Sequence, residues 1–106
     1  MVYKVIHRPK IGKFLIRLEP GKFAFLGYTI KDNKIYVEST YTPPEYRGRG
    51  IAARLMEAVV EWARERGLKV VPVCSYSLYF FKKHEEAWDV LDPEAISSVR
   101  SFELRK

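Results

Sequence analysis

The sequence predicts an α+β domain with the element order βββαβα, in which helices pack on the faces of a mixed, mostly antiparallel sheet of about four to five strands. Three observations carry this prediction. Strand-like runs separated by turn residues occupy the first part of the chain, an amphipathic helix pattern follows, and a short apolar run after it fits a buried strand. At 106 residues the chain can bury one modest core, so residues 1–106 are expected to form a single domain.

The strand-like runs are separated by two turn signals. Residues 13–19 alternate apolar and charged side chains, Pro20-Gly21 supplies a turn, and residues 22–30 resume an aromatic-rich run. Asp32-Asn33 is a second turn, and residues 35–42 are dense in β-branched and aromatic residues. Three antiparallel strands in meander order are therefore expected.

Helical spacing begins after Arg49. Apolar residues recur there with the period of a helix, at Ile51, Leu55, Ala58, Val59, Trp62 and Ala63. Gly67 follows where a helix C-cap would fall, so a helix of about four turns is predicted. Residues 68–73 then read as a buried strand and 76–84 as a second helix. Residues 93–99 are interpreted as a further helix with Asp92 as its N-cap.

Composition narrows the possible partners and compartments. Hydrophobic residues make up 47% of the chain, no apolar run approaches the roughly 20 residues of a membrane span, and the N-terminal residues lack the apolar stretch of a signal peptide. A cytoplasmic protein without membrane contact is expected. The net charge of +6 favours polyanions as partners. The absence of Gln and the single Asn33, beside many Lys, Arg and Glu, are typical of proteins from hot environments.

The cysteine and histidine content argues against a metal site. Cys74 is the only cysteine, so no intramolecular disulfide forms. His84 stands at the end of a predicted helix, where a favourable C-terminal charge is its expected role. His7 lies in a segment with Arg8, Pro9 and Lys10 that is interpreted as an irregular basic leader. The two histidines are too isolated to suggest metal binding.

The segment from Tyr46 to Ala52 has the features of an anion site. Gly48 and Gly50 allow a tight turn close to a ligand, and the helix that follows presents unpaired N–H groups with a partial positive charge. Arg47 and Arg49 add charge suited to a pyrophosphate. A glycine-assisted helix start with two solvated arginines is the alternative.

This segment resembles the signature [Q/R]xxGx[G/A] of the GCN5-related N-acetyltransferase superfamily, matched by Arg47, Gly50 and Ala52. Residues 37–46 are similar to that family's fourth strand and its lead-in, and residues 70–83 to its fifth strand and the following helix. The resemblance covers roughly residues 13–91. Cys74, Tyr76 and His84 further match a small branch of the superfamily with a Cys-x-Tyr pair after the fifth strand.

The resemblance implies a three-layer α/β arrangement and acetyl-coenzyme A (acetyl-CoA) as cofactor. Main-chain amides from Arg49 to Ala52 would hold the pyrophosphate, the strand around Thr40 to Thr42 would pair with the pantetheine arm, and the acetyl group would lie where the fourth and fifth strands splay apart. The implied cofactor-binding residues are Thr40, Tyr41, Thr42, Arg47, Gly48, Arg49, Gly50, Ile51 and Ala52.

Two groups of side chains are candidates for a catalytic role close to the thioester, either by accepting the acyl group or by stabilising the sulfur that leaves. Cys74 closes the predicted fifth strand, where it either accepts the acyl group or lines the pocket as a small apolar residue. In the wider superfamily a tyrosine often acts as general acid at the position that Phe81 occupies here. This leaves Tyr79 or Tyr76 to donate a hydrogen bond or a proton to the departing thiolate, or leaves water to protonate that thiolate. Aromatic core packing is the alternative for both tyrosines.

Glu38 is the candidate general base, acting directly or through water. It is the only carboxylate inside the third predicted strand, and strict alternation would put it on the same face as Tyr36 and Thr40. Larger relatives carry their glutamate earlier, nearer Lys34 in this chain. A solvated carboxylate without a catalytic role is the alternative.

Three functions are compatible with the sequence. The resemblance favours an N-acetyltransferase, monomeric or homodimeric, that acts on an amine of a protein or a small molecule. Phe81 and the missing strand glutamate leave open a non-catalytic coenzyme A binding module. A basic nucleic-acid-binding domain is supported by 19 Lys and Arg and several tyrosines, but no recognition-helix, zinc-finger or RNP pattern accompanies them.

Overall fold

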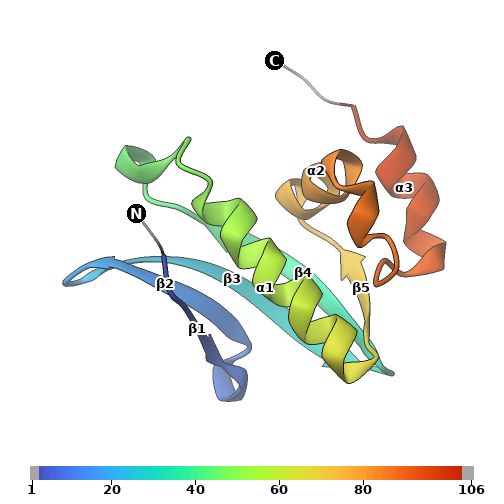
Figure 1. Ribbon diagram of the computed structural model, residues 1–106, viewed down its shortest axis with the longest axis horizontal. Helices are drawn as coiled ribbons and strands as arrows, with labels where there is room; N and C mark the ends of the chain where they lie inside the picture. Colours follow the sequence, from blue (N-terminus) through green and yellow to red (C-terminus); the bar gives the residue numbers. More distant parts are fainter. Residues whose placement is uncertain (1–2, 104–106) are drawn as a thin grey trace.

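The computed structural model describes residues 3–103 and contains a five-stranded mixed sheet with the order β1-β2-β3-β4-β5 (Figure 1). Neighbours from β1 to β4 are antiparallel, whereas β4 and β5 are parallel. The strands are β1 (Val5–Arg8), β2 (Lys13–Glu19), β3 (Lys22–Lys31), β4 (Lys34–Tyr41) and β5 (Lys69–Pro72). The α+β fold predicted from the sequence is therefore confirmed.

The three predicted meander strands are β2, β3 and β4. Gly21 has a φ of 82° at the β2–β3 turn, and Asp32 and Asn33 have φ of 54° and 62° at the β3–β4 turn. Asn and Asp tolerate this left-handed region better than other side chains, which is why this pair forms a tight hairpin turn. Both turn predictions are confirmed.

The N-terminal segment forms a strand, so the prediction of an irregular leader is wrong. β1 pairs with β2, and its inward-facing His7 stacks on Phe14 with ring centroids 4.0 Å apart and meets Trp62 edge-on at 4.7 Å. Desolvation by burial, together with the nearby charge of Arg66, holds the pKa of His7 below its ordinary value. Pairing and ring packing across the sheet thus order a segment whose local strand signal is limited to the β-branched pair Val5 and Ile6.

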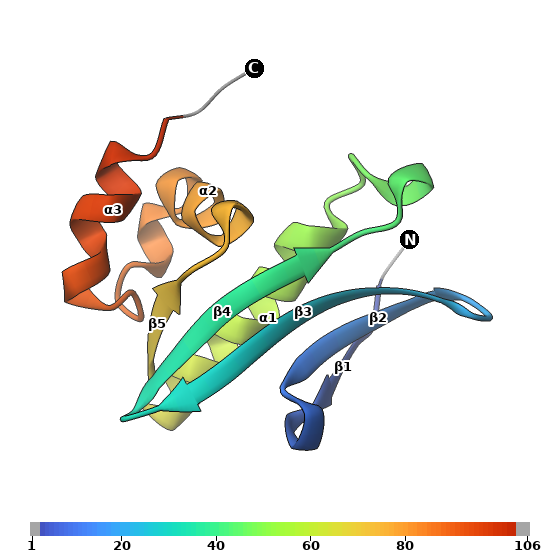
Figure 2. The ribbon, with the colours of Figure 1, turned by 180° about the vertical axis from the view of Figure 1, so that it is seen from behind.

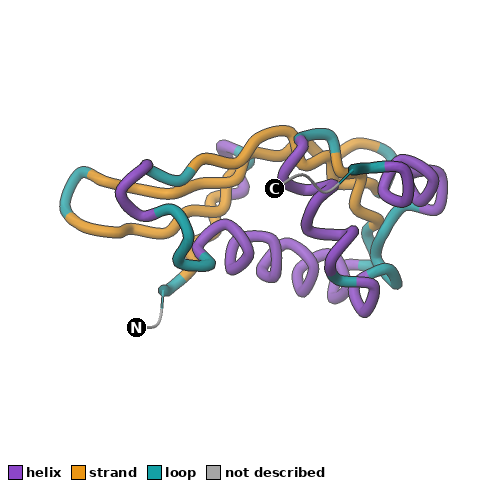
Figure 3. Tube along the Cα trace, turned by 90° about the horizontal axis from the view of Figure 1, so that it is seen from above, coloured by secondary structure: helices purple, strands orange, loops and turns teal. Residues whose placement is uncertain are grey.

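Helix α1 (Ile51–Arg66) crosses one face of the sheet and supplies much of the core. Its buried stripe consists of Ile51, Leu55, Met56, Val59, Val60 and Ala63, so four of the predicted positions are buried. The other two, Ala58 and Trp62, are half-buried and pack against this core. Gly67, with a φ of 69°, ends the helix and donates its N–H to the carbonyl of Ala63, as the C-cap prediction requires. Figure 3 shows the sheet and α1 as two layers.

The remaining helices gather beside β5. α2 (Ser75–Lys83) contacts α1, β4 and β5, and α3 (Ile96–Ser101) packs on α2 (Figure 1). Between them the chain returns along β5, where Val70 forms a parallel bridge with Leu91.

Asp92 stands at the predicted N-cap position, but its side chain does not cap the helix. A 3-10 turn (Pro93–Ala95) and then α3 follow Asp92, and the Asp92 carboxylate makes no capping bond. Asp92 pairs instead with Lys34 at 3.2 Å in a largely buried position. A buried carboxylate without a cation would be costly, so this pairing determines the orientation of the Asp92 side chain.

A β-bulge interrupts β4 at Glu38. Tyr28 pairs with Val37 and Leu26 pairs with Thr40, so two residues of β4, Glu38 and Ser39, lie opposite the single residue Gly27 of β3. Thr40 consequently faces α1, while Glu38 accepts a hydrogen bond from outward-facing Thr29 at 3.0 Å. The prediction that Glu38 and Thr40 share a face is wrong, because strict alternation fails at a bulge.

The face of β1–β4 opposite α1 carries no helix among the described residues (Figure 2). We call it the outer sheet face. The third layer implied by the resemblance is missing over these strands. None of the described helices is long and apolar enough to cross a membrane.

Candidate functional site

The site begins where β4 and β5 separate. Their pairing ends with Val37 opposite Pro72, and the carbonyl of Val37 then accepts the N–H groups of Val73 and Cys74 at 2.9 and 3.1 Å. From there the chain turns into α2, whereas β4 continues to Tyr41. The β5-facing main-chain edge of residues 38–41 is therefore open, because no strand pairs with it within residues 3–103.

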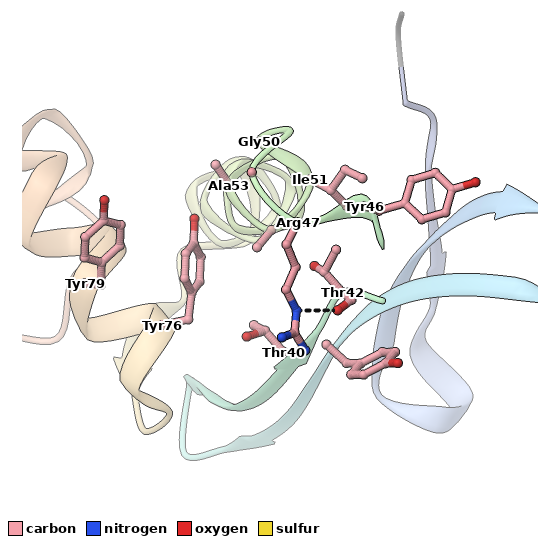
Figure 4. A pocket seen from close by; sticks show the side chains of 12 residues that line it. Thr40, Thr42, Tyr46, Arg47, Gly50, Ile51, Ala53, Tyr76 and Tyr79 are labelled. Carbon is pink, nitrogen blue, oxygen red and sulfur yellow. Dashed lines mark hydrogen bonds between the residues drawn. The ribbon is translucent and has the colours of Figure 1, made fainter. Parts of the chain in front are cut away.

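A cavity of about 500 Å³ lies at this opening (Figure 4). Its walls are the end of β4, the loop before α1, the first turn of α1, and α2. The lining residues are Thr40, Tyr41, Thr42, Tyr46, Arg47, Gly48, Gly50, Ile51, Ala52, Ala53, Tyr76 and Tyr79. Its size lies within the range of small-molecule sites.

The first turn of α1 directs unpaired amides to this cavity. The first helical bond runs from the N–H of Arg54 to the carbonyl of Gly50, at 3.0 Å, so Ile51, Ala52 and Ala53 have no acceptor inside the helix. Gly50 has a φ of 77°, and no side chain of the described residues caps this end. Three amides and the positive end of the helix dipole therefore favour an anion here.

The two arginines of the loop differ in position. Arg47 reaches across the cavity, and its Nε donates to the carbonyl of Thr42 at 3.0 Å (Figure 4). Arg49 lies outside the cavity lining, with its guanidinium 4.9 Å from the centre of the Tyr46 ring and a bond to the carbonyl of Glu45. Arg47 is thus the arginine placed to meet a ligand in the cavity.

The β2–β3 hairpin braces the loop from the other side. The Tyr46 hydroxyl donates a hydrogen bond to the Glu19 carboxylate, and Lys22 forms an ion pair with Glu45. The bond to Glu19 raises the pKa of Tyr46, and the bond from Lys22 lowers the pKa of Glu45. Tyr46, the first residue of the predicted segment, lines the cavity, and so does Ala53, which the sequence did not single out and which directly follows that segment.

Tyr76 and Tyr79 form the α2 wall of the cavity, with ring centroids 5.7 Å apart. Desolvation by burial raises the pKa of Tyr76 to about 12, with smaller contributions from nearby acidic groups. Its phenol therefore remains neutral at physiological pH and can donate a hydrogen bond. Tyr79 is more exposed, with 41% of its surface accessible.

Cys74 and Glu38 lie outside the cavity lining. Cys74 precedes the first residue of α2, and its Sγ lies 3.4 Å from the Oγ of Ser77, which in turn donates to the carbonyl of Cys74 at 2.7 Å. Glu38 is exposed on the outer sheet face. Of the predicted site residues, the structure brings together all but Cys74, Glu38 and Arg49.

The two histidines take part in ring packing and hydrogen bonds. His84 follows α2, stacks on Phe80 at 4.4 Å and bonds Glu86 at 2.9 Å. Residues 3–103 contain no group of three or more His, Cys, Asp or Glu side chains that could hold a metal ion.

Comparison with known proteins assigns the family. The model of the GCN5-related N-acetyl-transferase family matches residues 13–91, a span that includes every residue lining the cavity. The chain belongs to this family. The resemblance predicted from the Arg47–Ala52 loop is thereby confirmed, whereas the Cys-x-Tyr detail remains a prediction.

Family relatives with curated names match only part of their length. Thialysine N-epsilon-acetyltransferase of Bos taurus is 40% identical over 47 residues, which are 44% of this chain and 28% of that protein. The Mus musculus protein of the same name is 28% identical over 67 residues, or 63% of this chain and 39% of the relative. The matched segment is thus well under half of these relatives.

A solved family structure covers nearly the whole fold. A Staphylococcus aureus protein described as GCN5-like, determined by NMR in solution, superposes with a TM-score of 0.64 at 28% identity, over 84% of this chain and 87% of that one. This agreement supports the sheet order and the position of the cavity-forming elements.

Proposed function

We propose that this chain is an N-acetyltransferase that takes an acetyl group from acetyl-CoA and transfers it to a primary amine of a protein or small molecule. The observation that carries the proposal is the start of α1, where three unpaired amides line the same cavity as Arg47. These donors favour a multiply charged anion such as the pyrophosphate of coenzyme A. The names of the relatives support acetyl transfer to an amine.

The residues of the cavity fit such a ligand from its phosphates to its sulfur. Gly48 and Gly50, with φ of 83° and 77°, leave the loop free of side-chain bulk, so main-chain amides can approach the pyrophosphate. The open edge of β4 at Thr40 and Tyr41 can pair with the amides of a pantetheine arm, as a further strand would. Tyr76 then faces the end of the arm.

Acetyl-CoA supplies a thioester whose carbonyl carbon is attacked by a neutral amine. The nitrogen forms the new C–N bond and gives up a proton, and the C–S bond breaks to leave a thiolate that takes up a proton. Tyr76, with a pKa of about 12, is a weaker acid than a thiol of pKa about 8.5. It therefore stabilises the thiolate by a hydrogen bond and keeps its own proton.

The proton released by the amine needs an acceptor on the side from which the amine arrives. Glu38 stands at the bulge of β4, on the face opposite the cavity and one residue beyond the last β4–β5 pair. We assign it the role of accepting that proton, directly or through water. Cys74, bonded to Ser77, is assigned a role in the N-terminal turn of α2, so transfer is direct rather than through an acyl-enzyme.

The second candidate is a coenzyme A binding module without catalysis. Phe81, at the position where the wider superfamily carries its tyrosine, is completely buried and cannot act on a ligand. Two of the predicted catalytic residues also lie outside the cavity lining.

Isothermal titration with acetyl-CoA and with desulfo-coenzyme A, at low and moderate salt, tests the proposed cavity. Micromolar binding of both ligands that persists at moderate salt supports it, and no binding at millimolar ligand refutes both candidates. Release of free thiol in the presence of a panel of primary amines then separates them, because only the enzyme produces thiol in proportion to the amine consumed.

A further inference from the structure

The outer sheet face combines exposed aromatic residues with positive charge. Strands β1, β2 and β3 contribute four basic side chains to it, Arg8, Lys13, Arg17 and Lys31, as follows from alternation with the buried positions. The acidic residue at the end of β2, Glu19, accepts a hydrogen bond from Tyr46. None of the four forms an ion pair with another described residue. Their charge is therefore available to a partner.

A row of paired residues crosses this face at Gly27. One row of pairing runs from Arg8 through Lys13 and Gly27 to Ser39, the residue after Glu38. Gly27 adds no side chain to the row, and a Cβ there would lie 2.9 Å from the Oγ of Ser39. The row therefore has cations at one end, a flat centre, and a hydroxyl and a carboxylate at the other.

Aromatic rings lie on the neighbouring row of the same face. Phe25 and Tyr41 pair across β3 and β4 with ring centroids 5.5 Å apart, and the Lys13 ammonium lies 4.6 Å from the centre of the Phe25 ring. Tyr41 also lines the cavity on the other side of β4. The two rows thus reach β4 at the part of the strand that has separated from β5.

We propose that the outer sheet face binds an extended acidic polypeptide segment whose primary amine lies at Glu38 and Ser39, which makes this amine the acceptor of the proposed acetyl transfer. The inference rests on the proposed function for the transfer step, but the binding itself can be measured without it. A second copy of this chain would bring like charges together. A nucleic acid would bring phosphates to the Glu38 carboxylate, whereas an ammonium or amine complements it.

The spacing of the strands fixes where the acidic residues should lie. Neighbouring strands are about 4.8 Å apart, so Lys13 and Ser39 are separated by roughly 10 Å and Arg8 by about one spacing more. An extended peptide advances about 3.3 Å per residue. Acidic side chains are therefore expected three to four positions from the residue that carries the amine.

Two peptides test this prediction. They share the same N-terminal residue with a free amine and carry a fluorophore at the C-terminus; one has Glu and the other Lys at the fourth and fifth positions, which lie three and four residues from the amine. Binding is followed by fluorescence anisotropy without acetyl-CoA. Lys13→Glu is compared with Lys31→Glu, which makes the same charge change on the same face but four residues farther along β3 than Gly27.

We expect the acidic peptide to bind on the order of tenfold more tightly than the basic one and to lose this advantage in Lys13→Glu, while Lys31→Glu stays within about twofold of the parent protein. Equal binding of the two peptides, equal effects of the two variants, or tighter binding of a single-stranded oligonucleotide of the same charge overturns the proposal. Titration of acetyl-CoA into the same proteins reports separately on the proposed function.

Discussion

Replacement of Gly50 by Val tests whether the start of α1 is the anion site. Gly50 adopts a φ of 77°, and a Cβ added there meets no atom within 4 Å, so the cost of the side chain arises from backbone conformation and not from a clash. For an L-residue the left-handed region costs about 1–2 kcal/mol, and more for a β-branched side chain. In the free Gly50→Val variant, we expect the exposed loop to avoid this conformational energy by adopting a backbone conformation outside the left-handed region.

Ligand binding must restore the original loop, because the amides of Ile51, Ala52 and Ala53 converge on the cavity only in that arrangement. The conformational energy of residue 50 is then subtracted from the free energy of binding, and 1–2 kcal/mol corresponds to an affinity for acetyl-CoA that is lower by roughly 5–30-fold. A titration of acetyl-CoA into Gly50→Val should therefore give a dissociation constant raised by at least that amount.

Gly67→Val is the matched control. Gly67 lies at the opposite end of the same helix, has a φ of 69°, and also has no atom within 4 Å of an added Cβ. It should lower the melting temperature by about 4–8 °C per kcal/mol of strain without changing the affinity. An unchanged affinity in Gly50→Val, with a folded protein by circular dichroism, would refute the assignment of the loop.

Four further outcomes are expected. Arg47→Ala should weaken acetyl-CoA binding roughly tenfold while Arg49→Ala costs no more than about threefold, because only Arg47 lines the cavity; titration calorimetry checks both. Tyr76→Phe should lower kcat about 10–100-fold with little change in KM, as loss of a charge-assisted hydrogen bond to the thiolate requires. Cys74→Ala should retain transfer within about threefold and, like the parent protein, show no acylated enzyme by mass spectrometry. The lowered pKa of His7 means that the unfolded chain binds its proton first, so the urea midpoint should fall as the pH drops below about 6.5, and less so in His7→Phe.

The sequence predicted those elements whose signals are local. Helix α1 was recognised from its periodicity and the glycine at its end, and the two hairpin turns from Pro20-Gly21 and Asp32-Asn33. β1 was missed because its order depends on pairing with β2 and on the packing of His7 against Phe14, which are contacts between segments. No pattern within residues 5–8 carries that information.

The same distinction applies to the candidate site. The loop from Arg47 to Ala52 was found because glycines, arginines and a helix start lie together in the chain. The position of Glu38 was not found, since a bulge moves it relative to Thr40 and is defined by the pairing of β4 with β3. The guanidinium of Arg49 stacks on the ring of Tyr46 and lies outside the cavity lining, and residue spacing along the sequence does not reveal this contact.

The opening between β4 and β5 depends on the main chain. The Val37 carbonyl accepts two amides, β5 ends at Pro72, and the edge of β4 beyond this point is bare peptide. Side-chain substitutions on the outer sheet face leave these groups in place. A lineage could therefore exchange one acceptor for another by changing residues such as Lys13 or Phe25 while the donor site persists, so acceptor preference is expected to diverge faster among relatives than the cavity itself.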